Sequence, residues 1–227
     1  NLAYLYPEVS NEWHPSKNGF LKPSNVLSQT KKKVWWKCST NSSHEWEASI
    51  GNRTKGGSGC PICSNKKVEE TNNLDTLNPP LAKQWHPNKN VNILPTQVTS
   101  GSNKKVWWKC EKGSDHEWLA SVNSRNRGNN CPFCVNKKVC KDNNLKYKMP
   151  RIADQWHPTK NAPLLPEQVV YVSRKEVWWK CDKGDDHEWE AIIKDRNKGS
   201  GCAICANYKT VFSNSLGHLH PNLAKEW

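Results

Sequence analysis

Tryptophan recurs along this chain at a fixed step, and that periodicity restricts the possible folds more than any other feature. Trp13, Trp85, Trp156 and Trp227 lie 72, 71 and 71 residues apart. The other nine of the 13 tryptophans repeat at the same step: Trp35, Trp36, Trp46, Trp107, Trp108, Trp118, Trp178, Trp179 and Trp189. Such a step indicates tandem copies of one small module. We therefore expect repeats at residues 1–72, 73–143 and 144–214, and a fourth repeat that begins at 215–227 and stops, as in an excerpt from a longer array.

Each repeat opens with a proline that precedes a Trp-His-Pro motif. Pro7, Pro79, Pro150 and Pro221 each precede an aliphatic residue that lies four positions before the tryptophan, as Val9 lies before Trp13. Proline suits the first position of a helix, and residues four apart share one helix face. This pattern predicts a short helix that ends at Trp-His-Pro.

Two segments that alternate with a period of two follow in each repeat. In the first repeat, Val34, Trp36 and Cys38 share one face, and His44, Trp46, Ala48 and Ile50 share another. Alternation of this kind predicts two strands of a hairpin with an apolar inner face. The same pattern recurs in the other repeats at Val106, Trp108, Cys110, His116, Trp118, Ala120 and Val122, and at Val177, Trp179, Cys181, His187, Trp189, Ala191 and Ile193.

Nine of the ten cysteines fall on one template, Cys-x5-His followed after 14 or 15 residues by Cys-x2-Cys. The three sets are Cys38, His44, Cys60 and Cys63; Cys110, His116, Cys131 and Cys134; and Cys181, His187, Cys202 and Cys205. Four such ligands suit a closed, structural tetrahedral zinc site, so we expect three Zn²⁺ ions, one per repeat. We also expect the Cys-x2-Cys turn to lead into a helix, with Pro61 and Pro132 near its start.

A disulfide framework is the alternative to zinc. Three cysteines per repeat would leave one unpaired in each, and the repeated histidine would have no role. Zinc is therefore favoured, and it points to a reducing intracellular compartment, the cytoplasm or nucleoid. Cys140 has no counterpart in the other repeats and is expected to be a bystander thiol.

These motifs resemble a known family. Val34-Trp35-Trp36-Lys37-Cys38, His44-Glu45-Trp46, Asn52-Arg53 and Cys60-Pro61-Ile62-Cys63, preceded by Trp13-His14-Pro15-x-Lys17-Asn18, are similar to a bacterial "probable zinc-ribbon" repeat, a treble-clef-type zinc finger often found in tandem. The resemblance implies the same four ligands per repeat and a role as a DNA-binding accessory module. The expected fold class is thus a tandem array of small zinc-stabilised α+β modules of the treble-clef or zinc-ribbon kind, each a β-hairpin plus short helices.

The chain is strongly basic, with 34 Lys and Arg against 21 Asp and Glu and a formal charge of +13. Nine thiolates and three Zn²⁺ ions reduce this charge to about +10. Such a balance favours nucleic acid as a partner. The cations recur in the loop before Cys-x2-Cys and just before the first strand, so phosphate contacts are expected from Lys32, Lys33, Arg53, Lys55, Lys104, Lys105, Arg125, Arg127, Arg174, Lys175, Arg196 and Lys198. A solvated surface without a ligand is the alternative.

The outward-facing tryptophans and the histidine of the Trp-His-Pro motif also recur in every full repeat. Trp35, Trp107 and Trp178 point away from the inner face, so they are either covered by the Trp-His-Pro helix or exposed for stacking on bases. His14, His86 and His157 have no repeated cysteine partner left and are expected to cap or pack.

We therefore predict a nucleic-acid-binding module of a larger protein, DNA rather than RNA, which mainly contacts backbone phosphates. The alternative is a protein-interaction or architectural scaffold. No apolar run approaches the ~18 residues of a membrane span, so no membrane is expected as a partner. A small-molecule substrate is not expected either. We expect no enzymatic activity, because the one repeated His/Cys cluster is a saturated metal site.

Overall fold

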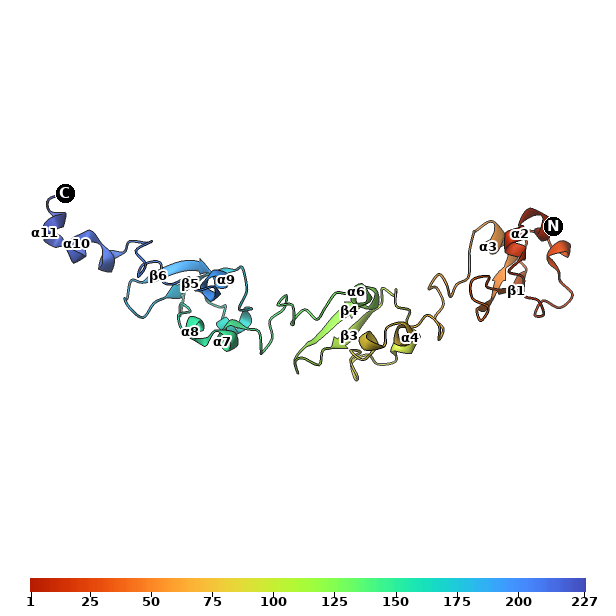
Figure 1. Cartoon of the computed structure of the whole chain (residues 1–227), viewed down its shortest axis with the longest axis horizontal. Helices are drawn as coiled ribbons and strands as arrows, with labels where there is room; N and C mark the ends of the chain where they lie inside the picture. Colours follow the sequence, from red (N-terminus) through yellow and green to blue (C-terminus); the bar gives the residue numbers. More distant parts are fainter. The chain divides into compact units, whose positions relative to one another are not determined.

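The computed structural model describes residues 1–227 and contains three copies of one α+β module, followed by a short helical segment (Figure 1). The first copy contains α1 (Leu2–Leu5), α2 (Pro7–Ser10), the 3₁₀ helix η1 (Pro23–Asn25), β1 (Lys33–Lys37), β2 (Glu45–Ser49) and α3 (Ile50–Thr54). The second contains α4 (Leu74–Leu77), α5 (Pro79–Ala82), η2 (Pro95–Gln97), β3 (Lys105–Lys109), β4 (Glu117–Ser121) and α6 (Val122–Asn126). The third contains α7 (Leu145–Lys148), α8 (Pro150–Ala153), η3 (Pro166–Gln168), β5 (Glu176–Lys180), β6 (Glu188–Ile192) and α9 (Ile193–Asn197). The last segment contains η4 (Phe212–Asn214), α10 (Leu216–Leu219) and α11 (Pro221–Ala224). None of these helices is both long and apolar enough to cross a membrane.

The predicted hairpins are confirmed as three separate two-stranded sheets. β1 pairs antiparallel with β2 so that Trp36 lies opposite Trp46, and β5 pairs with β6 in the equivalent register. Within β1 the side chains alternate between the buried face and the outer face, as the sequence pattern predicts. Ile50 begins α3 instead of continuing β2, because the Ser49 hydroxyl accepts a hydrogen bond from the Asn52 amide and caps the helix.

The helix expected to reach the Trp-His-Pro motif is shorter than predicted. α2 ends at Ser10, and Trp13 forms an isolated β-bridge with Trp36 of β1. The Lys37 amide donates to the Glu12 carbonyl at 2.7 Å, and the His14 amide donates to the Trp35 carbonyl at 3.1 Å. Backbone that pairs with a strand edge cannot remain helical, so this bridge ends the helix early.

No helix follows the Cys-x2-Cys turn, contrary to expectation. The turn closes through hydrogen bonds from Ser64 N to Cys60 O and from Asn65 N to Ile62 O. Asn65 then adopts a left-handed conformation with φ of 56°, as do Asn136 and Asn207 with φ of 56° and 59°. A residue in this conformation ends a helical turn, so the segment remains a single turn.

Each module is built around one fully buried tryptophan of the first hairpin strand. In the first repeat this residue is Trp36, whose ring is packed edge-on against Trp13 with centroids 5.5 Å apart. Its indole N–H donates to the Ala48 carbonyl at 3.0 Å, so no polar atom of the ring is left without a partner. The metal-ligand candidates Cys38 and Cys60 belong to the same core cluster. The zinc site and the apolar core are therefore one structure.

The outward-facing tryptophans are half-buried, because the lysine and the asparagine of the Trp-His-Pro-x-Lys-Asn motif contact them. The Asn18 side-chain amide pairs with the backbone of Trp35 like a strand neighbour, accepting from its N–H at 2.7 Å and donating to its carbonyl at 2.9 Å. The Lys17 ammonium lies over the Trp35 ring, 4.6 Å from its centroid. Lys89 and Lys160 cover Trp107 and Trp178 in the same way, at 4.6 and 4.0 Å. A lysine, not the helix, therefore covers these rings.

The expected structural role of the motif histidine is confirmed. His14 is buried, and its Nδ1 accepts hydrogen bonds from the amides of Ser16 and Lys17 at 3.2 and 3.1 Å. The opposite ring nitrogen, Nε2, lies 3.0 Å from Glu45 Oε1. Contacts with Lys17, first, and with His14 lower the pKa of Glu45 to about 2. This histidine therefore fixes the turn that follows Trp13.

Candidate metal centre

The hairpin turn supplies two ligands of each site, and the loop after the hairpin supplies the other two. Cys38 follows β1 and His44 precedes β2, and the Cys38 amide donates to the His44 carbonyl at 3.0 Å. Cys60 and Cys63 lie on the turn that follows α3. Three groups of Cys, His, Cys and Cys side chains converge in this way, one in each repeat.

The distances between the donor atoms fit a zinc tetrahedron. Zn–S bonds of about 2.3 Å and Zn–N bonds of about 2.0 Å place two sulfurs about 3.8 Å apart, and sulfur and nitrogen about 3.5 Å apart. In the first site, Cys38 Sγ and Cys63 Sγ are 3.6 Å apart, and His44 Nδ1 lies 3.6 and 3.3 Å from the sulfurs of Cys60 and Cys63. These residues fit three structural zinc ions, one per repeat.

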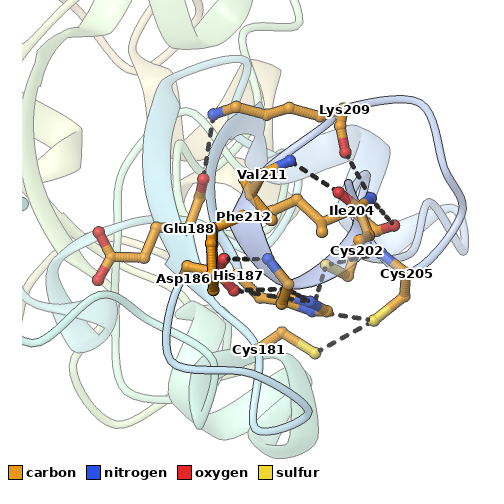
Figure 2. Close-up of polar contacts among 12 residues, drawn as sticks. Cys181, Asp186, His187, Glu188, Cys202, Ile204, Cys205, Lys209, Val211 and Phe212 are labelled. Atoms are coloured by element: carbon orange, nitrogen blue, oxygen red, sulfur yellow. Dashed lines mark hydrogen bonds and ion pairs between the residues drawn. The ribbon is translucent and has the colours of Figure 1, made fainter. Parts of the chain in front are cut away.

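The third site has the same geometry (Figure 2). Cys181 Sγ and Cys205 Sγ are 3.7 Å apart, and His187 Nδ1 lies 3.3 Å from Cys205 Sγ and 3.8 Å from Cys202 Sγ. A disulfide requires about 2.05 Å between sulfurs, and every cysteine of the chain is free. The disulfide alternative is therefore excluded.

Burial and the neighbouring thiols favour the protonated form of the last cysteine of each site. Burial, followed by the hydrogen bonds of Cys38 and Cys60, raises the pKa of Cys63 to about 12. The same causes raise the pKa of Cys134 to about 12 and that of Cys205 to about 11. Bound Zn²⁺ stabilises the thiolate forms, and protons compete for the same sulfurs.

The ring nitrogen of each ligand histidine that faces away from the metal has its own partner. His44 Nε2 lies 2.9 Å from Thr71 Oγ1, His116 Nε2 lies 3.3 Å from Asp142 Oδ1, and His187 Nε2 lies 3.2 Å from Ser213 Oγ. Nδ1 faces the sulfurs, so the neutral imidazole carries its proton on Nε2 and donates there. Such contacts orient the ring and increase its basicity.

Sequence reasoning missed these acceptors, because Thr71, Asp142 and Ser213 have different side chains, although they share the 71-residue step. In the third repeat the acceptor is itself fixed. The Ser213 hydroxyl donates to Asp186 Oδ1 at 2.7 Å, and the Ser213 amide donates to Asp186 Oδ2 at 2.8 Å. The serine hydroxyl thus links the carboxylate of Asp186 to the ring of His187.

We expect Ser213→Ala to weaken zinc binding at the third site by about 10- to 100-fold, because it removes the acceptor that orients His187. The measurement is a chelator titration in which hydrogen exchange of a peptide covering residues 202–205 reports metal release. Ser200→Ala is the matched control, because Ser200 is exposed and its hydroxyl makes no hydrogen bond. Equal affinity of the two variants would contradict a role for the Ser213 hydroxyl.

Cys140 lies next to the second site but outside its ligand set. Its thiol is buried and lies 2.8 Å from Asp142 Oδ1 and 3.3 Å from His116 Nε2. Asp115, His116 and Cys140 form a fourth group of possible ligands, but this group shares His116 with the second zinc site. Because His116 Nε2 carries the proton, it is a donor here and not a ligand.

Three of the five arginines assigned to phosphate binding lie inside the modules, and that assignment is wrong for these three. Arg53, Arg125 and Arg196 are only 6%, 7% and 5% exposed. Their guanidinium groups donate to a loop carbonyl and to the residue before the Trp-His-Pro motif: Ser58 and Glu12, Asn129 and Gln84, and Ser200 and Gln155, respectively. Their donors are thus used within the core and do not reach an external phosphate.

Each of these arginines also stacks on the core tryptophans. The Arg53 Cζ atom lies 5.1 and 5.3 Å from the ring centroids of Trp36 and Trp46. Burial lowers the pKa of the Arg53 guanidinium, and the carboxylate of Glu12 opposes that effect. The first repeat is one residue longer in this loop, and Arg53 reaches a carbonyl five residues ahead instead of four. The arginine therefore fixes the loop that carries Cys60.

The other cations assigned to phosphate binding are exposed. These are Lys32, Lys33, Lys55, Lys104, Lys105, Arg127, Arg174, Lys175 and Lys198. The acidic residues that pair with lysines pair with others than these, as Glu188 does with Lys160 at 2.6 Å. The exposed cations are therefore available to an external anion.

The fold and the three sites define a class of protein, a tandem array of small zinc-binding α+β modules. A family model described as a probable treble clef zinc finger domain matches residues 9–66, 81–137 and 152–208. Because these segments cover more than half of the chain, the protein belongs to that family, in agreement with the resemblance noted in the sequence. No similar protein was found among those with curated descriptions.

Proposed function

We propose that this zinc-binding array is a non-catalytic nucleic-acid-binding module, for DNA rather than RNA, that contacts backbone phosphates through its exposed lysines. One observation carries the proposal. The lysines that recur at the start of the first hairpin strand, Lys32, Lys33, Lys104, Lys105 and Lys175, are exposed and have no acidic partner, whereas Arg53, Arg125 and Arg196 are buried. Unpaired recurring cations in a chain of charge about +10 attract a polyanion.

The zinc sites support the absence of catalysis. Four protein ligands complete a tetrahedron and leave no position for water or substrate. All ten cysteines are free thiols, which suits a reducing intracellular compartment.

The test is the salt dependence of binding to a labelled DNA duplex, measured by fluorescence anisotropy. Each phosphate contact contributes about −0.9 to the slope of log K against log salt, so we expect a slope steeper than about −3. The variant K32Q/K33Q/K105Q should bind at least about tenfold more weakly than K22Q/K83Q/K225Q, which removes the same charge from exposed lysines outside the recurring clusters. An affinity that barely changes between low and physiological salt would refute the proposal and favour a scaffold role.

A further inference from the structure

Two recurring lysine clusters that are far apart in the sequence line one groove. Lys137 and Lys138 follow the second Cys-x2-Cys turn, and Lys175 precedes β5. All three lysines are exposed and line a groove of about 520 Å³. The groove contains no acidic residue; its other lining residues are Phe133, Val139, Leu164, Gln168, Val169, Val170 and Ser173.

Asn143 forms hydrogen bonds with both chain segments that line this groove. The Asn143 side-chain amide donates to the carbonyls of Phe133 and Lys138 at 3.0 and 2.9 Å, and the Asn143 carbonyl accepts from the Tyr171 amide at 3.1 Å. The neighbouring Leu145 amide donates to the Val169 carbonyl at 2.9 Å. The turn with the first two lysines is thereby held against the segment before the third.

The backbones of the three lysines are fixed, while their side chains are free. The amides of Lys137 and Lys138 both donate to the Pro132 carbonyl, at 2.7 and 3.1 Å. The Lys175 amide donates to Ser173 Oγ at 3.1 Å, and the Lys175 carbonyl accepts from Ile193 at 3.1 Å. None of the three ammonium groups has an ion-pair partner. Cations on a rigid backbone lose less conformational freedom when they bind an anion.

The chemistry of the groove fits a sugar–phosphate backbone better than a small ion. Its lining combines ammonium groups with apolar side chains, among them Phe133, Leu164 and Val169. Ammonium groups bind phosphate as point charges, and apolar side chains suit the carbon atoms of deoxyribose. A free phosphate ion would use only the lysines.

Two of the three equivalent lysines in the other repeats have partners within the protein, and Lys66 of the first repeat is the exception. Lys67, the counterpart of Lys138, pairs with Glu69 at 2.8 Å, and Glu69 stands where the second repeat has Cys140. Lys209, the counterpart in the third repeat, donates to the Glu188 carbonyl at 3.1 Å, and Tyr208 replaces the other lysine. The second repeat is thus distinguished by two free lysines at this turn.

We propose that the groove lined by Lys137, Lys138 and Lys175 is a binding site for the phosphodiester backbone of DNA. This inference rests on the proposed function and gives it a location. It also assigns a ligand-binding role to the turn that carries Cys131 and Cys134, so the single zinc ion of the second repeat would position a DNA contact.

The test compares four zinc-loaded proteins: the wild type, K137Q/K138Q/K175Q, K137R/K138R/K175R, and the equally charged control K22Q/K83Q/K225Q. Binding to a duplex of about 20 base pairs is measured across salt concentrations, and zinc content and near-UV circular dichroism verify the fold. We expect the glutamine variant of the groove to bind at least about tenfold more weakly than the control and to lose about 2 to 3 from its salt slope. The arginine variant should bind like the wild type, and DNA should slow hydrogen exchange in residues 132–143 and 169–176.

The outcomes separate this inference from the proposed function. If the wild type does not bind DNA, the proposed function fails and the groove proposal fails with it. If the wild type binds but the groove variant matches the control, the groove proposal alone fails. A polyglutamate of equal charge that displaces DNA equally well would show recognition of acidic protein, and inorganic phosphate that competes at equal phosphate concentration would show a free-anion site; either result overturns the groove proposal.

Discussion

Removal of zinc is expected to unfold every repeat. The ligand cysteines Cys38 and Cys60 are part of the core around Trp36. A module of about 70 residues with a single small core has little folding stability unless a metal ion or a disulfide adds to it. A structural zinc ion contributes on the order of 10 kcal/mol of folding free energy. Excess chelator should therefore abolish the near-UV circular dichroism of the buried tryptophans, and added Zn²⁺ should restore it. Retention of the signal in metal-free protein would contradict this prediction.

A single ligand substitution should confine the effect to one repeat. Cys38→Ser is expected to lower the zinc content from three ions to two and to accelerate hydrogen exchange in residues 33–50, while residues 176–192 remain protected, because each repeat has its own core. Cys140→Val is the control, since Val211 occupies the equivalent position of the third repeat, and it should retain three ions. Loss of an ion from Cys140→Val would place that thiol among the ligands.

The metal ligands and hairpins could be predicted because their signals are local. Cys38 and His44 are separated by one hairpin turn, and Cys60 and Cys63 by a single turn, so the spacing already determines which atoms meet. The alternation of Val34, Trp36 and Cys38 likewise defines one strand face without any long-range information. Threefold recurrence of three cysteines and one histidine favoured zinc over disulfides, and the distances between the sulfurs then excluded disulfides.

The role of the arginines could not be predicted in this way. An arginine beside glycines in a loop of variable length has the pattern of an exposed phosphate ligand. What buries Arg53 is its contact with Glu12, which lies 41 residues earlier, and the same separation joins Arg125 to Gln84 and Arg196 to Gln155. That constant separation is visible in the sequence, but periodicity alone does not distinguish a contact from a coincidence.

The early end of the first helices is a second long-range effect. Val9 and Trp13 have helical spacing, yet Trp13 bridges Trp36, a residue 23 positions away in the sequence. Tertiary pairing with the edge of β1 therefore overrides local propensity. The contact between Asn18 and Trp35 is also long-range, because the Asn18 side chain forms the hydrogen bonds that a neighbouring strand would form with the Trp35 backbone.

Substitution of the buried arginine should destabilise the first repeat more than the third. Arg53→Met leaves the carboxylate of Glu12, only 14% exposed, without its cation, and breaking a buried ion pair costs about 3–5 kcal/mol. Arg196→Met leaves the neutral amide of Gln155 unpaired, which costs about 1–3 kcal/mol. Native-state hydrogen exchange in residues 33–50 and 176–192 gives the local unfolding free energy of each repeat in the full-length, zinc-loaded chain.

The double variant E12Q/R53M separates the charge effect from packing. It gives the first repeat the same neutral pair as R196M gives the third, so its cost should fall to about 1–3 kcal/mol although two residues are changed. If R53M and R196M lower the local unfolding free energy equally, the unpaired carboxylate of Glu12 does not destabilise the first repeat. Protonation of the carboxylate or an inserted water would then replace the missing cation. If instead R53M left hydrogen exchange unchanged and weakened DNA binding, Arg53 would be an exposed phosphate ligand after all. The structure excludes that role, because Glu12 and Ser58 already accept from both terminal nitrogens of its guanidinium.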